Sequence, residues 1–141
     1  MSGSSPAERE GQFVEHMQDF TRREFSAFDG AIASDVTMVL PGSSWLAGTF
    51  TGYEGVRRCI LGLRRVLDSK ETALSFLHEG NHMFVRHEIV VHGPTHQVTM
   101  RLRVRVRYND DDEVDALFVE PEDLGLFDHV VNSVLTNKDT A

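Results

Sequence analysis

The feature that most constrains this chain is the alternation of apolar and polar residues that begins after Lys70. Alternation with period two is typical of strands that bury one face. The breaks in the pattern, at residues 80–81, 93–95 and 109–113, have turn composition and are short enough to join antiparallel neighbours. We therefore predict a meander of four strands in sequence order. The predicted strands cover residues 72–78, 82–91, 97–108 and 114–120.

The chain before residue 68 has helical spacing instead. Apolar residues recur every three or four positions over 7–25 and over 53–67, which predicts two amphipathic helices. A shorter helical piece is predicted over 28–33. A strand over 36–40 follows, and Pro41 stops it because proline has no amide hydrogen for the ladder. The apolar segment 43–51 is predicted to fold over the core as a flap.

The end of the chain is predicted to be a third main helix. Pro121 would open it, since proline is tolerated best at the first helical position, and Leu124, Phe127 and Val130 would point inward. Residues 1–6 and 136–141 are predicted to be disordered. We therefore expect one domain over residues 1–141, of the α+β class, with helices packed on one side of an antiparallel sheet.

The turns decide which side chains share a face of that sheet. A turn centred on Gly80 and Asn81 places Leu74 opposite His87, and the next turn places Leu102 on the other side of His87. The acidic loop 109–113 leaves two registers open, because a slip of one residue exchanges the faces of the last strand. We prefer the register that pairs Val106 with Ala116.

The preferred register turns Phe118 and Glu120 toward the helices. Glu120 then lies roughly 10 Å from His87, at a distance of two strand spacings. Asp115 lies beside Arg107 on the outer face, where opposite charges attract. The outer face also carries apolar side chains among its arginines, and this mixture predicts a homodimer through that face. The apolar side chains are Phe84, Val90, Leu117 and Val119.

Charge and composition exclude several classes of partner. The formal net charge of −8 disfavours nucleic acid, because phosphate backbones are bound through clustered lysine and arginine. The one cysteine, Cys59, lies on the apolar face of the predicted helix 53–67, which favours a buried hydrophobic side chain over a nucleophile. No apolar run approaches the roughly 18 residues of a membrane span, and no targeting segment is recognisable. We expect a cytoplasmic protein with no membrane contact.

The order of these elements, with the segments PGSSWLAGTFTGYEGV and FVEPEDLGLFDHVV, resembles the SnoaL-like branch of the nuclear-transport-factor-2-like superfamily. The resemblance implies a cone-shaped, cystatin-like fold in which a curved antiparallel sheet wraps a long helix, often in a dimer. It implies no single activity, because this fold hosts cyclases, isomerases, dehydratases, epoxide hydrolases and non-catalytic binders.

The chain departs from this family at both of its usual acid/base positions. SnoaL-type cyclases carry an acidic residue on the last strand, and ketosteroid isomerases carry a base on the strand before the proline. The aligned positions here are Val119 and Leu40, and neither side chain can exchange a proton. A catalytic site would therefore have to use other residues.

His87 and Glu120 are the candidate catalytic residues, because both would face the predicted pocket and both can exchange protons. The candidate substrate-binding residues are Trp45, Tyr53, Phe76, His78 and Phe118. This set predicts general acid/base catalysis, such as cyclisation, isomerisation or dehydration, on a hydrophobic metabolite. The SnoaL-like resemblance implies a polyketide as one candidate. The alternative is a protein of the same fold that binds a hydrophobic ligand without changing it.

The histidines at positions 78, 82, 87, 92 and 96 have the composition of a metal site but not its geometry. The predicted register points His82 and His92 away from His78 and His87, so no three converge. We expect neither a metal nor an organic cofactor.

Overall fold

The structure is a computed structural model that describes residues 5–22, 32–66, 69–92 and 97–139. This part of the chain forms three helices and six strands. In chain order they are α1 (Pro6–Arg22), β1 (Ile32–Leu40), β2 (Gly48–Thr51), α2 (Gly52–Val66), β3 (Ser69–Glu79), β4 (His82–His92), β5 (Gln97–Tyr108), β6 (Val114–Pro121) and α3 (Leu124–Asp139).

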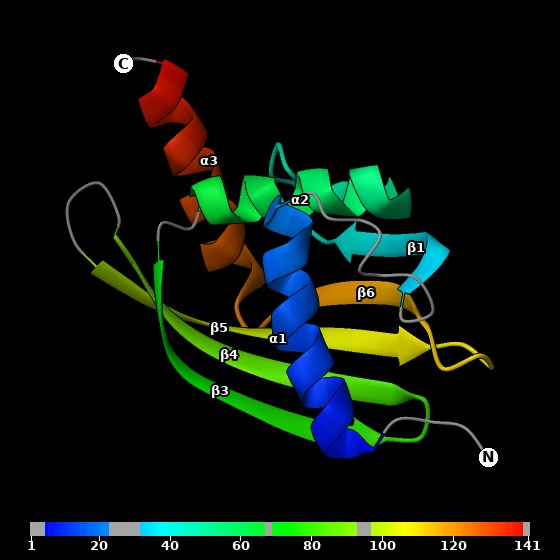
Figure 1. Cartoon of the computed structure of the whole chain (residues 1–141). Coiled ribbons are helices and arrows are strands. Elements are labelled where there is room, and N and C mark those ends of the chain that lie inside the picture. Colours follow the sequence, from blue (N-terminus) through cyan, green and yellow to red (C-terminus); the bar gives the residue numbers. More distant parts are fainter. Residues whose placement is uncertain (1–4, 23–31, 67–68, 93–96, 140–141) are drawn as a thin grey trace.

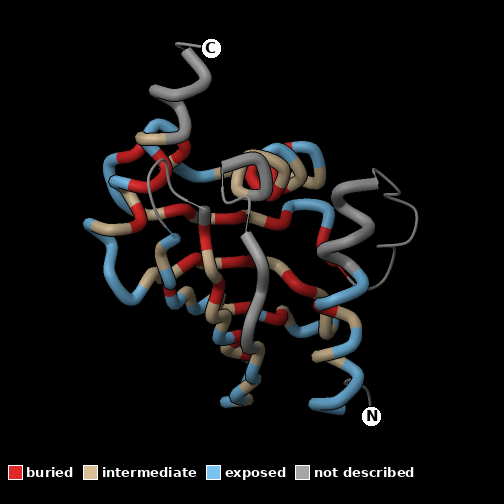
Figure 2. The backbone as a smooth tube through the Cα atoms, turned by 90° about the vertical axis from the view of Figure 1, so that its left-hand side faces the viewer, coloured by how far each residue is buried: buried red, intermediate tan, exposed pale blue. Residues whose placement is uncertain are grey.

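The strands form one sheet in the order β2-β1-β6-β5-β4-β3. Strands β3 to β6 are the predicted antiparallel meander, and β6 continues the sheet by pairing in parallel with β1. The sheet is curved, and the helices lie on its concave face (Figure 1). Buried residues gather where the sheet meets the helices (Figure 2). This arrangement confirms the helix-wrapped α+β architecture, with a mixed rather than a purely antiparallel sheet.

Two predictions for the first half of the chain are wrong at their boundaries. Ile32 and Ala33 belong to strand β1, not to a short helix, because Ile32 pairs with Val114 of the distant strand β6. Residues 28–31 of that predicted helix lie outside the described part of the chain. The flap contains a strand, since Gly48–Thr51 pairs with β1 and places Thr49 opposite Val39.

Side-chain caps explain where α1 and α3 begin. At α1 the hydroxyl of Ser5 accepts from the amide of Glu8 at 3.2 Å, and the carboxylate of Glu8 accepts from the amide of Ser5 at 3.1 Å. The second of these hydrogen bonds is the main reason that the pKa of Glu8 is lowered. Pro6 occupies the first helical position, so α1 begins inside the segment predicted to be disordered.

The last helix does not begin at Pro121, which instead ends β6 opposite Leu102. It begins at Leu124, where the carboxylate of Asp123 accepts from the amide of Leu126 at 3.0 Å. The helix runs to Asp139, into the tail that was predicted to be disordered.

The largest correction concerns the register of β6. The predicted register holds only at its first pair, Tyr108 with Val114, and the next pair is Arg107 with Ala116. Asp115 is the extra residue of a β-bulge, and it shifts every later pair by one position. Val106 therefore lies opposite Leu117, not Ala116, and the two faces of the strand are exchanged.

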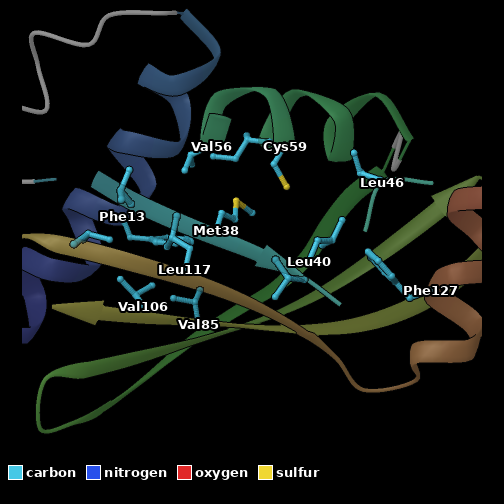
Figure 3. Close-up of a cluster of buried hydrophobic side chains, with 14 of the residues drawn as sticks. Phe13, Met38, Leu40, Leu46, Val56, Cys59, Val85, Val106, Leu117 and Phe127 are labelled. Carbon is cyan, nitrogen blue, oxygen red and sulfur yellow. The ribbon is translucent and has the colours of Figure 1, made fainter. Parts of the chain in front are cut away.

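The exchange puts Leu117 and Val119 in the core, where they are 2% and 3% exposed. Figure 3 shows Leu117 on the same side of the sheet as Val85 and Val106, facing the core. The predicted dimer interface therefore loses two of its four apolar residues, and the dimer itself stays a prediction.

The apolar side of α2 closes the core over β1. Val56 and Cys59 are fully buried and lie close to Met38 of the strand (Figure 3). Burial raises the pKa of the Cys59 thiol to about 12, which leaves it protonated at neutral pH. The structure agrees with the expected role of Cys59 as a buried hydrophobic side chain.

Candidate functional site

The concave face of the sheet carries one region that the core does not fully cover. It surrounds His87, which lies between Leu74 of β3 and Leu102 of β5. Phe76 and Val104 lie one row further along the same face and are also only half-buried. The neighbours of His87 on the same face of β4, Val85 and Ile89, are buried. We call Leu74, Phe76, His87, Leu102 and Val104 the concave patch.

Helix α1 lies over this patch. The ring of Phe13 meets the imidazole of His87 with 6.1 Å between ring centroids and a tilt of 52°. The carboxylate of Glu10 pairs with Nε2 of His78 at 2.6 Å, at the turn end of β3. These contacts hold one side of α1 against β3 and β4, so any molecule on the concave patch must fit beside the helix.

A second pair of contacts attaches the start of α1 to the far end of β5. The guanidinium of Arg9 lies 4.0 Å above the ring of Tyr108 and pairs with Asp112 at 2.5 Å. Burial is the main cause that raises the pKa of Tyr108 to about 12. Both Arg9 and Asp112 are more than four-fifths buried at their side chains, which makes this pair part of the packing rather than a solvated surface contact.

Three of the seven predicted site residues come together on the concave face. They are Phe76, His78 and His87, all placed by the pairing of β3 with β4 and of β4 with β5. Trp45 and Tyr53 have other partners. The indole nitrogen of Trp45 donates to the carbonyl of Val131 on α3 at 3.1 Å, and the hydroxyl of Tyr53 donates to the carbonyl of Ile32 at 3.0 Å.

Phe118 and Glu120 lie on the outer face, contrary to the predicted register. The carboxylate of Glu120 accepts from Nε of Arg103 at 2.8 Å, and its other oxygen lies 3.6 Å from Nε of Arg105. The guanidinium of Arg105 lies 4.1 Å above the ring of Phe118. Glu120 and His87 are therefore separated by the sheet, and they cannot act together on one bound molecule.

Neither the partner of His78 nor the partner of Arg9 was predicted. Glu10 and Asp112 are far from these residues in sequence, and only the packing of α1 across the sheet brings them together. The alternation predicts that the leucines of the concave patch face the helices. It does not predict that the core leaves them partly exposed. Among the described residues, no group of three histidine, cysteine or acidic side chains is placed to hold a metal ion.

No protein-family model matches the sequence, and no curated protein matches it at a significant level. Solved structures do match. A nuclear-transport-factor-2-like protein from Burkholderia xenovorans is 16% identical with a TM-score of 0.64, and the match covers 82% of this chain and 91% of that one. A candidate polyketide cyclase from Acidithiobacillus ferrooxidans is 18% identical with a TM-score of 0.59, over 94% of this chain and 99% of that one.

A third similar structure is TerC, co-crystallised with polyporic acid. It is 18% identical with a TM-score of 0.64, and the match covers 86% of this chain and 95% of that one. None of the described helices of the present chain is both long and apolar enough to cross a membrane. Identities this low establish a shared fold and leave the activity open. The chain has the cystatin-like fold of the nuclear-transport-factor-2-like proteins, as its resemblance to the SnoaL-like branch implied.

Proposed function

We propose that this protein binds a hydrophobic small molecule on the concave patch, beside α1. The observation that supports this proposal is the exposure of Leu74, Phe76, Leu102 and Val104 on a face whose other described strand positions are largely buried. Half-buried apolar side chains around one polar group are typical of sites that take up a hydrophobic ligand and orient it.

His87 is the polar group of this site. An imidazole both donates and accepts hydrogen bonds, so it can meet a hydroxyl, a carbonyl or a carboxylate at one end of the ligand. Its ring also contacts Phe13 of α1, which links the helix to whatever His87 binds. The apolar side chains would supply most of the affinity, and His87 would supply the orientation.

The comparisons support a ligand of this kind. TerC has a similar fold and was co-crystallised with polyporic acid. The present protein need not bind the same compound, but polyporic acid is a suitable first probe because a similar fold has been crystallised with it.

A general acid/base enzyme is the second candidate. The position of His87 favours it, because a histidine on a ligand-binding face can take a proton from carbon or give one to a leaving hydroxyl. The inward position on β6 that would hold the family's acid is Val119, which is buried and apolar. With Glu120 on the other face, the predicted catalytic pair is reduced to His87.

Binding is tested by titrating polyporic acid and the dye 1-anilinonaphthalene-8-sulfonate into the protein, followed by calorimetry and fluorescence. Phe76→Ala should weaken both probes by about tenfold, because the lost ring area corresponds to about 1.4 kcal/mol or more. Leu77→Ala is the matched control, since Leu77 is the next residue of β3 and lies on the outer face at 58% exposure. Equal effects of the two substitutions, with both variants folded, would contradict the proposed site.

Catalysis is tested separately with a β-hydroxyketone, 4-hydroxy-4-phenylbutan-2-one. Its dehydration removes a proton from the carbon next to the carbonyl and releases the hydroxyl as water, and the conjugated product absorbs in the near ultraviolet. An enzyme would lose about 10²- to 10⁴-fold in rate on His87→Gln. A binding protein would give no product with either form, and His87→Gln would change only the affinity for the two probes.

A further inference from the structure

The outer face of the sheet carries a row of arginines that nearly all have carboxylate partners. Along β5, Arg101 pairs with Glu88 at 3.1 Å, Arg103 with Glu120 at 2.8 Å and Arg107 with Asp115 at 2.8 Å. Such pairs hold the guanidinium groups in place but are weak where both side chains are exposed. Pairing with a carboxylate is therefore the usual state of the described arginines on this face of β5.

Arg86 of β4 is in that different environment. Its side chain is exposed, and among the described residues no carboxylate lies within ion-pair distance of it. Its cross-strand neighbour on β5 is another arginine, Arg103, and its neighbour on β3 is Ser75. Like charges directly opposite one another in a sheet are destabilising, and of these two arginines only Arg103 has a carboxylate partner among the described residues.

The charge next to Arg86 is not balanced by Glu120. That carboxylate is shared between Arg103 and Arg105, at 2.8 Å and 3.6 Å. Among the described residues, the three guanidinium groups of Arg86, Arg103 and Arg105 thus have one carboxylate within ion-pair distance, that of Glu120. Two further carboxylates, those of Glu88 and Glu122, lie nearby but pair with Arg101, at 3.1 Å and 3.6 Å.

A hollow of about 490 Å³ lies at this place. It is lined by Ser75, by three arginines (86, 101 and 103), by three glutamates (88, 120 and 122), and by His87, Leu102 and Pro121, so its formal charge is neutral overall. Its volume falls in the range of about 300–1,000 Å³ that is usual for small-molecule sites. The residues that line it toward its other end, Arg101 and Glu122, lie 3.6 Å apart as a further ion pair. The charged groups that line the hollow are therefore held in ion pairs, except for the guanidinium of Arg86, which has no such partner among the described residues.

We propose that this hollow binds the carboxylate or phosphate group of a small molecule through the guanidinium groups of Arg86 and Arg103 and the hydroxyl of Ser75. A planar guanidinium matches an oxyanion with two parallel N–H donors, and charge-assisted hydrogen bonds of this kind are stronger than neutral ones. A bound anion would also remove the repulsion between the two arginines. Arg86, Arg103 and Ser75 lie on the outer face of the sheet, although His87 and Leu102 of the concave patch also line the hollow. The anion site does not rest on the proposed function, because none of its three binding groups belongs to the concave patch.

A second copy of the chain is a weaker occupant for this surface. The centre of a protein interface is usually apolar and poor in charge, and burying charged pairs costs desolvation energy. The apolar residues Leu117 and Val119 that would have formed such a centre lie in the core instead. What remains around the hollow is charged and exposed, which suits a small hydrated anion better.

The test is a titration with sodium phosphate, and separately with sodium succinate, at constant ionic strength kept with sodium chloride. The side-chain Nε–H signals of the arginines are followed by two-dimensional nuclear magnetic resonance. The signals of Arg86 and Arg103 should shift and saturate, and Arg86→Gln should weaken the binding by about tenfold. Saturation with only one of the two salts would identify the oxyanion as phosphate or as carboxylate.

Arg107→Gln is the matched control. Arg107 lies on the same face of β5 but is paired with Asp115 and does not line the hollow. It should leave the titration unchanged, and a melting curve for each variant checks the fold. The proposal is overturned if the shifts fail to saturate or if the two variants behave alike. It is also overturned if light scattering gives a dimer that Arg86→Gln dissociates while phosphate and succinate have no effect, because the site would then belong to a second copy.

Discussion

Arg103 of β5 lies directly opposite Glu120 of β6, and its Nε donates to the carboxylate at 2.8 Å on the outer face of the sheet. This pair has a consequence on the other face. Since neighbouring residues of a strand point to opposite sides, Val119 must point into the core. The position that the family resemblance associates with an acid is therefore inward but apolar, which favours ligand binding over proton transfer.

The first prediction tests this register with two adjacent substitutions. Val119→Glu should lower the free energy of unfolding by about 3–5 kcal/mol, because it buries a carboxylate without a partner. Phe118→Glu should change it by about 1 kcal/mol or less, since Phe118 is on the outer face close to Arg105 and Arg107. Urea unfolding of both variants measures the difference. The register without the bulge at Asp115 would reverse the order of the two effects.

The sequence predicts the meander and the place of His87 well because the connections between those strands are short. A turn at Gly80 fixes the pairing of β3 with β4 within a few residues, and the alternation then decides every face. Gly80 has a φ of 61°, which glycine adopts readily, so turn composition and turn geometry agree there.

The register of β6 could not be predicted in the same way. The loop before it has several acidic residues of similar character, and its shape depends on Asn109, whose side-chain oxygen accepts from the amides of Asp111 and Glu113 at 3.0 Å and 2.9 Å. Asp112 adopts a φ of 59°, which no residue type in the segment makes obvious. A single extra residue at Asp115 then moves Glu120 to the other face, and with it half of the predicted catalytic pair.

The second prediction concerns Cys59 and alkaline pH. Its pKa is raised from 9.0 to about 12 by burial, so the unfolded chain loses this proton first as the pH rises. The free energy of unfolding should therefore fall as the pH increases from about 9 toward 12, and the thiol should contribute no pH dependence below that range. Cys59→Val should reduce the slope between about pH 9 and pH 10, below the range in which Tyr108 titrates.

The same burial predicts a slow thiol reaction. An aromatic disulfide reagent at neutral pH should label Cys59 only as fast as the protein unfolds, because the thiol is both buried and protonated. Rapid labelling of the folded protein would contradict both the burial and the raised pKa.

The last prediction concerns the loop after β1, which is fastened to α3. The carboxylate of Asp128 accepts from the amide of Ser43 at 3.1 Å and from its hydroxyl at 3.3 Å. Gly42 makes this approach possible. Its φ is 101°, and a Cβ at this position would lie 2.3 Å from an oxygen of Asp128. Gly42→Ala should therefore destabilise the protein by about 1 kcal/mol for the backbone strain alone, and further for the clash with Asp128.

Gly80→Ala is the matched control, because its φ is also positive but a Cβ there would meet nothing within 4 Å. In urea unfolding, Gly42→Ala should cost more than Gly80→Ala. The double variant Gly42→Ala/Asp128→Ala should cost less than the sum of its two single substitutions, since the second removes the atoms that the new methyl group would strike. Strict additivity would mean that the loop does not rest on Asp128 in this way.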